Sequence, residues 1–262
     1  MTHSTVGCTR EGPLALIVLR RPQAGNAFDG ALRAELSAAL DSVATDDAIR
    51  CVVIGAEGRH FCTGADLKEA ASPESQDIER QIRIEYRPIF DAITNMPKPV
   101  IAAITGTAAG AGVSLAAACD LRVMADDAAL VLPFSRIGLV TDCALSWWLV
   151  HHLGYARAYE LAIEAQSIDA SSALAAGIVN RVVPRAQVMQ HAKDWAVSLS
   201  ARAPLALAAT KRAMRHALVN GPMSTFDEEA KLQRDCATSA DHREGVTAFL
   251  EKREPVFTGK TR

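Results

Sequence analysis

Phe61-Cys62-Thr63-Gly64-Ala65-Asp66-Leu67 is the stretch that decides the fold of this chain. It follows an apolar run at 51–54 and a glycine-containing turn at 55–58. Small side chains after a buried strand let backbone N–H groups approach a ligand oxygen, and such donors stabilise a developing oxyanion. The stretch therefore predicts one half of an oxyanion-binding site.

A second turn of the same kind follows another apolar strand. Gly106-Thr107-Ala108-Ala109-Gly110-Ala111-Gly112 comes after Val100-Ile101-Ala102-Ala103-Ile104. One donor is only half of an oxyanion site, so the second donor has to come from another small-residue turn. We therefore expect the two turns, 61–67 and 106–112, to act together.

Outside these turns, apolar runs alternate with helical patterns. Residues 14–19 read as a strand, and Asp29 is a candidate N-cap for a helix with apolar residues at helical spacing up to Val43. Residues 77–95 read as a helix that ends before Pro97. Strands without polar interruptions, separated by helices, predict a parallel sheet covered on both faces, and the last third reads as mostly helical.

Composition and net charge limit the classes of function that this chain can have. The chain has 262 residues, 49% of them hydrophobic but only 5% aromatic, which favours one large helix-rich α/β domain, with or without an appendage. Its net charge of -2 gives no basic field for nucleic acid or an anionic membrane, and the basic segment 211–216 is interpreted as a solvated helix face. Residues 99–119 lack charges, but their glycines and hydroxyl residues indicate a buried strand, turn and helix rather than a membrane span.

The six cysteines form no CxxC pair, and no secretory signal is visible at the N-terminus, so we expect a cytoplasmic protein. The glycines at 106, 110 and 112 depart from the G-x-G-x-x-G dinucleotide fingerprint, and no G-x-x-x-x-G-K-[ST] motif is present. His151 and His152 are adjacent and cannot share a metal in the i, i+4 manner. No cofactor or metal is therefore expected.

Short ordered motifs along the whole chain resemble the crotonase superfamily, the enoyl-CoA hydratases and isomerases. The resemblance implies an α/β fold with a ββα spiral core (1–195) and a C-terminal helical trimerisation region (196–262). It implies homotrimers or dimers of trimers that act on acyl-CoA thioesters. The matching motifs are Asn26-Ala27, 61–67, 97–104 with Gly106, 118–122, 138–140, 176–184, Thr210-Lys211, 243–246 and 257–260.

By this resemblance, the N–H groups of Ala65 and Ala111 hold the thioester carbonyl. Ala111 stands where the family usually has glycine. Its backbone N–H can still donate if the local φ is one that a residue with a Cβ can adopt. The two catalytic glutamates of the hydratases are absent, because Ser114 and Phe134 occupy their positions. Both are interpreted as lining the pocket, and hydration by two carboxylates is not expected.

One carboxylate remains at a position that carries function in related isomerases. Asp142 resembles the aspartate of dienoyl-CoA isomerases, ring-epoxide isomerases and aryl-CoA dehalogenases. A single carboxylate with a raised pKa can remove a proton from one carbon and return it to another. The alternative is an Asp142 that caps the following helix.

Coenzyme A contacts carry over from the family by position, and CoA enters only as part of the substrate. They comprise Ala24, the backbone of Ala65, Asp66, Leu67 and Lys68, and the tail residues Phe257 and Lys260, which reach in across a subunit boundary in many relatives. Lys68 has an equally good interpretation as a solvated loop lysine.

The sequence thus predicts an acyl-CoA isomerase that shifts a double bond, or rearranges an unsaturated or ring-derived acyl group, with Asp142 as base. A hydratase with a non-standard base remains an alternative. So does a non-catalytic family member that binds acyl-CoA or RNA. A dehalogenase-like route ranks below these, because no histidine stands near Arg87.

Overall fold

A six-stranded sheet forms the centre of the protein, seen here in a computed structural model that describes residues 4–71 and 77–259. Its strands lie in the order β1-β2-β3-β5-β7-β10. All neighbours from β2 onward are parallel, which confirms the prediction, and β1, which was not predicted, pairs antiparallel with β2. The bounds are β1 Val6–Glu11, β2 Leu14–Leu19, β3 Cys51–Ala56, β5 Val100–Ile104, β7 Leu121–Ala125 and β10 Arg181–Val183.

A smaller sheet of four strands lies beside one end of the larger one, in the order β4-β6-β8-β9. Consecutive strands of the chain enter different sheets: β3 and β4, β5 and β6, and β7 and β8 each place one strand in each sheet. This is the predicted ββα spiral. The bounds are β4 His60–Cys62, β6 Thr107–Ala109, β8 Ala129–Val131 and β9 Ser167–Asp169.

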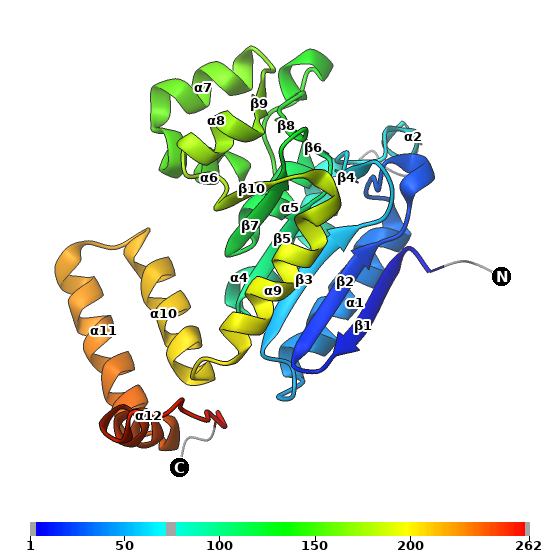
Figure 1. Cartoon of the computed structure of the whole chain (residues 1–262). Coiled ribbons are helices and arrows are strands. Elements are labelled where there is room, and N and C mark those ends of the chain that lie inside the picture. Colours follow the sequence, from blue (N-terminus) through cyan, green and yellow to red (C-terminus); the bar gives the residue numbers. More distant parts are fainter. Residues whose placement is uncertain (1–3, 72–76, 260–262) are drawn as a thin grey trace.

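Helices cover both faces of the larger sheet (Figure 1). On one face lies α9 (Val188–Ser200), which contacts β2, β3, β5 and β7, and on the other lies α1 (Gly30–Thr45). The Asp29 carboxylate accepts a 2.8 Å hydrogen bond from the N–H of Leu32, which confirms the expected N-cap. Leu36 and Leu40 of α1 are fully buried, as their spacing predicts.

The segment 77–95 is not the single helix that its pattern suggests. It consists of α3 (Ile78–Gln81), a π-helical turn η3 (Ile82–Tyr86) and α4 (Arg87–Asn95). Pro88 near the start of α4 cannot donate a backbone hydrogen bond, which favours a break in the preceding turn. Such π-helical turns are frequent at functional sites.

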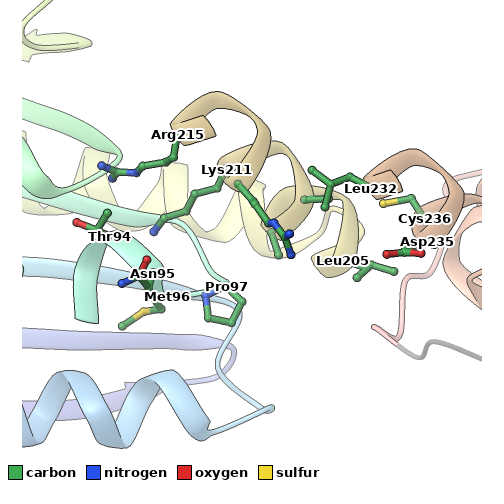
Figure 2. Close-up of a pocket in the computed structure, with 13 residues that line it drawn as sticks. Thr94, Asn95, Met96, Pro97, Leu205, Lys211, Arg215, Leu232, Asp235 and Cys236 are labelled. Carbon is green, nitrogen blue, oxygen red and sulfur yellow. The ribbon is translucent and has the colours of Figure 1, made fainter. Parts of the chain in front are cut away.

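The C-terminal helices α10, α11 and α12 form an arm that projects from the core (Figure 1). Lys211 and Arg215 of α10 point back toward the core (Figure 2). Each forms an ion pair with Asp120, at 2.8 and 2.9 Å. Beside them, a pocket of about 390 Å³ separates the arm from the end of α4. The expected boundary between core and C-terminal region, at 195/196, falls inside α9, which packs on the sheet along its length. This domain boundary stays a prediction.

The remaining helices connect these parts. The segment 99–119 forms β5, β6 and α5, as expected, and within the described residues no helix is long and apolar enough to cross a membrane. The bounds are η1 Pro22–Ala24, α2 Leu67–Ala70, α5 Ala111–Ala118, η4 Phe134–Ile137, α6 Leu145–Leu153, α7 Tyr155–Ile163, α8 Ala170–Ala175, η5 Arg185–Gln187, α10 Pro204–Ala217, α11 Pro222–Ala237 and α12 Ala240–Glu251.

Candidate functional site

The two small-residue turns meet in the folded protein. A Cβ added to Gly64 would lie 2.9 Å from the carbonyl oxygen of Ala109 and 3.4 Å from the nitrogen of Ala111. A Cβ added to Gly112 would lie 2.1 Å from the carbonyl oxygen of Cys62. Backbones can approach this closely only where side chains are absent, so the glycines allow the two turns to form one site.

Among the described residues, the N–H groups of Ala65 and Ala111 take no part in the backbone hydrogen bonds that link the loops here. Phe28 donates a 2.8 Å hydrogen bond to the carbonyl of Gly64 and accepts one of 2.9 Å from the N–H of Asp66; neither bond uses the N–H of Ala65. Ala111 is the first residue of α5, where a backbone N–H has no acceptor inside the helix. Ala111 is helical and its φ is not positive, so it carries its Cβ without strain. The backbone at this position therefore accepts alanine in place of glycine.

The N-terminal loop packs on the first turn and brings Ala24 to the site. The N–H of Thr63 donates to the carbonyl of Gly25 at 3.1 Å, and Gly25 has a φ of 59°. Buried Asn26 donates 2.9 Å hydrogen bonds to the carbonyls of Glu57 and His60, which fixes the loop against the start of β4. The loop position predicted for Ala24 is therefore next to the turn that carries Ala65.

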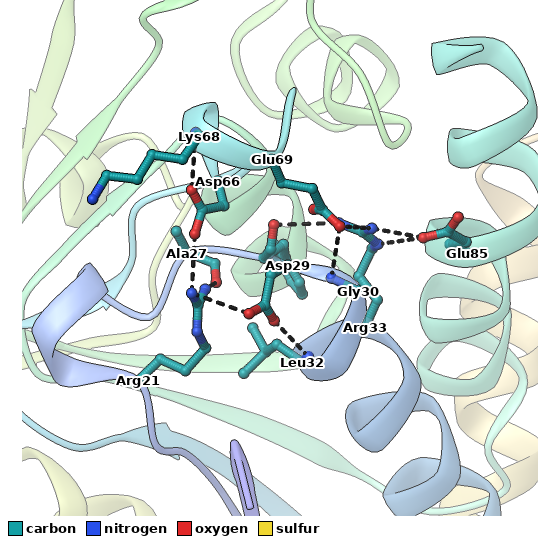
Figure 3. Close-up of polar contacts among 11 residues, drawn as sticks. Arg21, Ala27, Asp29, Gly30, Leu32, Arg33, Asp66, Lys68, Glu69 and Glu85 are labelled. Carbon is teal, nitrogen blue, oxygen red and sulfur yellow. Dashed lines mark hydrogen bonds and ion pairs between the residues drawn. The ribbon is translucent and has the colours of Figure 1, made fainter. Parts of the chain in front are cut away.

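Two arginines that the sequence did not single out bind the first turn and the helix that follows it (Figure 3). Arg21 forms 3.0 Å ion pairs with Asp29 and Asp66. The Arg21 hydrogen bond is the largest cause that holds the pKa of Asp66 below its usual range. The Asp66 side chain is thus bound to the protein, and only its backbone remains for a predicted role in substrate binding.

Arg33 forms the second part of this network (Figure 3). Its guanidinium is 3% exposed and pairs with Glu69 of α2 at 2.8 Å and Glu85 of η3 at 2.7 Å. Glu69 also accepts a 3.0 Å hydrogen bond from the N–H of Gly30. Arg33 therefore ties the helix after the first turn to the π-helical turn. The sequence holds one clue to this role: Arg33 is a charged residue on the apolar face of α1, three positions before the buried Leu36.

Asp142 lies in a strained loop before α6. The two following residues, Cys143 and Ala144, have φ values of 50° and 64°, which non-glycine residues seldom adopt. Burial raises the pKa of the Asp142 carboxyl to about 6, against the opposing effect of a hydrogen bond with the Cys143 thiol. Its Oδ1 atom is buried without a hydrogen-bond partner. Strain and an unpaired carboxylate oxygen cluster at sites of function.

The structure does not support the alternative that Asp142 caps α6. The N-cap position is Ala144, and no side chain forms a capping hydrogen bond there. Instead, the carbonyl oxygen of Asp142 accepts hydrogen bonds from the N–H of Leu145 at 2.9 Å and from the hydroxyl of Ser114 at 3.2 Å. The loop is held through its backbone, and the carboxyl, which hydrogen-bonds with the Cys143 thiol, keeps one oxygen unpaired.

Ser114 contacts the Asp142 loop, and Phe134 lies beside the second turn. Ser114 is fully buried, so it contributes an anchor for the Asp142 loop rather than an exposed pocket wall. The Phe134 ring lies 3.8 Å from the position of a Cβ on Gly110, and Phe134 also lines an apolar pocket with Leu149. Phe134 thus borders the second turn, as a wall of the acyl site would.

The predicted CoA contacts divide into two groups. Leu67 and Lys68, directly after the first turn, are exposed, and the Lys68 side chain points away from the Asp66 network (Figure 3). Phe257 lies on the arm instead, against Gly245 of α12, and its carbonyl accepts a 2.9 Å hydrogen bond from Arg50. Lys260 lies outside the described residues. Within the described residues, the single chain therefore places Phe257 on the arm and not at the turns.

In the ranges 4–71 and 77–259, no group of three His, Cys, Asp or Glu residues is placed to hold a metal ion. All six cysteines carry free thiols, and burial raises the pKa of Cys51 and Cys62 to about 12. These thiols are unreactive at neutral pH.

The spiral α/β core, with two small-residue turns in close contact, defines the class of fold to which this protein belongs. The sequence profile of the enoyl-CoA hydratase/isomerase family matches residues 9–260. The chain is 40% identical over 260 residues to a probable enoyl-CoA hydratase of Rhodobacter capsulatus, covering 99% of this chain and 100% of the relative. It is 36% identical to the 1,2-epoxyphenylacetyl-CoA isomerase of Escherichia coli, covering 93% and 94%.

Solved structures agree with this assignment. A crystal structure of an enoyl-CoA hydratase from Bacillus anthracis superposes with a TM-score of 0.94 at 28% identity, covering 98% of this chain and 100% of that one. A hydratase subunit from Geobacillus kaustophilus gives 0.92 at 32% identity, covering 98% of each chain. The chain belongs to the enoyl-CoA hydratase/isomerase family, and its fold is the crotonase fold.

Proposed function

We propose that this family member is an acyl-CoA isomerase in which Asp142 moves a proton between two carbons of the acyl group. The observation that carries the proposal is the Asp142 carboxyl, with a pKa raised to about 6 and an unpaired Oδ1 in a loop anchored to α5. A base works best when its pKa lies near the working pH. An ordinary exposed aspartate would be too weak a base for this task.

In the proposed reaction, the thioester carbonyl accepts hydrogen bonds from the N–H groups of Ala65 and Ala111. The ionised carboxylate of Asp142 removes a proton from a carbon of the acyl group, and the electron pair moves toward the carbonyl oxygen to form an enolate. The protonated carboxyl then returns the proton to a different carbon, and the double bond migrates. One proton moves and no redox partner is needed, so coenzyme A enters only as part of the substrate.

Two further observations support isomerisation over hydration. Addition of water to a double bond needs groups that activate the water and deliver a proton, and at the positions of the two family glutamates this chain has buried Ser114 and Phe134. One relative, from Escherichia coli, is named as an isomerase. Relatives named as hydratases make a hydratase with another base the alternative that a test has to address.

The test compares wild type with Asp142→Asn on 2-enoyl- and 3-enoyl-CoA in deuterium oxide, with products identified by NMR. We expect wild type to interconvert the two and to incorporate deuterium beside the thioester, and the variant to lose both activities. Asp126→Asn, at an exposed loop carboxyl, is the matched control and should behave as wild type. Water addition without isomerisation, exchange that survives in Asp142→Asn, or binding without turnover would each contradict the proposal.

We further propose that the working unit is a homotrimer or a dimer of trimers in which the arm meets a second copy. Large apolar side chains on α12 are open to solvent in the single chain: Phe249 is 82% exposed and Leu250 74% exposed. Exposed apolar residues in a cluster are typical of interfaces. Light scattering after gel filtration should give three or six times the chain mass of 27.9 kDa; a monomer would contradict the proposal.

A further inference from the structure

The backbone around Ala65 is held by an isolated bridge of parallel β-structure to Phe28. Phe28 donates a 2.8 Å hydrogen bond to the carbonyl of Gly64 and accepts one of 2.9 Å from the N–H of Asp66. Neighbouring N–H groups of an extended chain point to opposite sides, so the N–H of Ala65 points away from Phe28. The bridge therefore sets the direction of this N–H group.

The bridge is short and needs further support. It consists of one residue pair outside the named strands of both sheets. Even a two-stranded ribbon with several pairs is only marginally stable by itself in water. A small shift of the turn would misdirect the Ala65 N–H, because hydrogen bonds weaken steeply as their angle departs from linear. Side chains that tie the two segments together are therefore the groups that can keep this donor in place.

The Arg21 guanidinium ties these two segments together (Figure 3). Its Nη1 donates a hydrogen bond to the carbonyl of Ala27, and its Nη2 forms 3.0 Å ion pairs with Asp29 and with Asp66. Ala27 and Asp29 belong to one segment, on either side of the bridged residue, and Asp66 belongs to the other. The guanidinium thus spans the bridge, and its planar fork holds both segments in one geometry.

Arg21 is itself anchored to the loop that carries it. Its N–H donates a 2.8 Å hydrogen bond to the side-chain oxygen of Asn26, and its carbonyl accepts one of 2.8 Å from the Asn26 N–H. Asn26 is fully buried and donates two 2.9 Å hydrogen bonds, to the carbonyls of Glu57 and His60. The Arg21 and Asp66 side chains are only 14% and 15% exposed. Because this pair is anchored and mostly shielded from water, it keeps its geometry better than a surface ion pair does.

The second arginine of the network, Arg33, is placed differently. Its ion pairs reach side chains of α2 and η3, which follow the turn, and its bond to the bridge is a 3.3 Å hydrogen bond to the Phe28 carbonyl. Arg21 instead binds Asp66, the residue that directly follows Ala65. Of the two arginines, Arg21 therefore has the more direct hold on the Ala65 backbone.

We propose that Arg21 is a positioning residue: it keeps the Ala65 N–H directed at the thioester carbonyl and so increases the polarisation of that carbonyl. The inference rests on the proposed function, because it takes Ala65 as one of the two oxyanion donors. In this role Arg21 contacts neither the substrate nor the reacting atoms, and it acts through Asp66 and the bridge. Donors aimed in advance at the developing charge contribute strongly to catalysis, and a misplacement of about 1 Å can lower the rate about 100-fold.

The test uses Arg21→Met, which keeps a side chain of similar length and removes the guanidinium. The ligand is butyryl-CoA, a saturated thioester that does not react, isotope-labelled at its carbonyl so that infrared difference spectroscopy measures the carbonyl stretch. Hydrogen bonds from Ala65 and Ala111 should lower this frequency in wild type relative to the free thioester in water. Arg21→Met should lose about half of the shift or more, because one of the two donors is misdirected.

Kinetics and binding should divide in the same variant. We expect kcat for deuterium exchange with 3-enoyl-CoA to fall about 10- to 100-fold in Arg21→Met, with KM nearly unchanged. The Kd for butyryl-CoA should change less than about tenfold, since water replaces a lost hydrogen bond in the ground state. Spectra and rates are compared at a temperature at which denaturant titration shows every variant to be folded. A loss of stability therefore does not enter the comparison.

Arg20→Met is the matched control, because Arg20 is the neighbouring arginine and pairs with Glu57 at 3.0 Å on the exposed surface. It should keep both the wild-type frequency shift and kcat. Asp66→Asn is a second variant: asparagine can still cap α2 at the N–H of Lys68, but the charge that Arg21 binds is gone. It should reduce the shift in the same direction, and the double variant should lose no more than Arg21→Met.

The same spectra separate this inference from the proposed function. Asp142→Asn should abolish deuterium exchange yet keep the wild-type carbonyl frequency. If Asp142→Asn retains exchange while Arg21→Met still loses the shift, the assignment of the base fails and the role of Arg21 stands. A wild-type frequency in Arg21→Met, with or without a fall in kcat, would leave Arg21 with a structural role only and overturn the inference. A wild-type protein that does not shift the carbonyl at all would overturn it too.

Discussion

The two halves of the site are built in different ways. The backbone half comprises the turns 61–67 and 106–112. Their glycines let the two main chains approach closely, and backbone hydrogen bonds hold the neighbouring loops. The side-chain half comprises Ser114, Phe134 and Asp142, and it holds an unpaired buried carboxyl oxygen and two successive strained residues. In the proposed function, the backbone half would stabilise a charge common to many reactions, while the side-chain half would decide which reaction follows.

Removal of the carboxyl from the side-chain half should have the largest effect. We expect Asp142→Asn to lower kcat for isomerisation by about 10³-fold, because a positioned base contributes roughly 10²–10⁴-fold. Binding of a saturated acyl-CoA should change little, since the backbone donors remain. A steady-state assay with calorimetric binding checks both, and a parallel loss of binding would show that Asp142 holds substrate rather than moving its proton.

A small substitution in the backbone half should instead break the fold. Gly112→Ala would place a Cβ 2.1 Å from the Cys62 carbonyl oxygen, so we expect the free energy of unfolding to fall by about 2–4 kcal/mol. Gly245→Ala, in helix α12, is the matched control. Its Cβ would lie 3.6 Å from the Phe257 ring, an ordinary van der Waals distance. Urea denaturation distinguishes them; equal stability would mean that the turns do not depend on this close approach.

This difference explains what the sequence could predict. The backbone half follows from local patterns: glycine and alanine after apolar strands mark turns that tolerate close approach, and the strands at 14–19 and 100–104 lie where expected. The parallel order and the Asp29 cap also follow from spacing and residue type. Such features depend on neighbours in the chain.

The side-chain half depends on residues far apart in sequence. Tyr86 stands at helical spacing with Ile82, Ile89 and Ile93, so the pattern indicates an ordinary core residue. Only the fold shows that its ring packs against Phe28 and the Arg33 guanidinium. Likewise β1 was missed because four of its six residues are exposed, and an edge strand with one buried end carries no apolar run.

The raised pKa of Asp142 predicts a cost in stability. The folded state raises this pKa from 3.8 to about 6, so the protonated form favours folding, and that contribution is lost as pH rises through about 6. Above this pH, Asp142→Asn should therefore be more stable than wild type, by on the order of 1–3 kcal/mol. Near pH 4 the difference should vanish. Thermal unfolding across this range measures it, and a variant less stable than wild type at neutral pH would refute the raised pKa.

The charge network under the first turn links the halves, since Arg33 joins α2 to the π-helical turn that carries Tyr86. Arg33→Met should lower the free energy of unfolding by about 1–3 kcal/mol, because two carboxylates lose a buried partner. Arg83→Met, at an exposed pair with Glu79, should cost less than about 0.5 kcal/mol. Denaturant titration of the two variants compares them, and similar losses would remove Arg33 from this role.

The smallest effect is expected at the anchor of the Asp142 loop. Ser114→Ala removes one of two hydrogen bonds to the Asp142 carbonyl, and the bond from Leu145 remains. We expect a loss of about 1 kcal/mol in the free energy of unfolding and less than a tenfold fall in kcat. If kcat instead fell as far as in Asp142→Asn, Ser114 would have a direct part in the chemistry.

The pH dependence of deuterium exchange beside the thioester tests the central claim most directly, because it reports the ionisation of the base in the working enzyme. With Asp142 as base, kcat/KM for wild type should rise about tenfold per pH unit below pH 6 and level off above it. A profile that is flat across this range, or that rises only in alkaline solution, would contradict the assignment of Asp142.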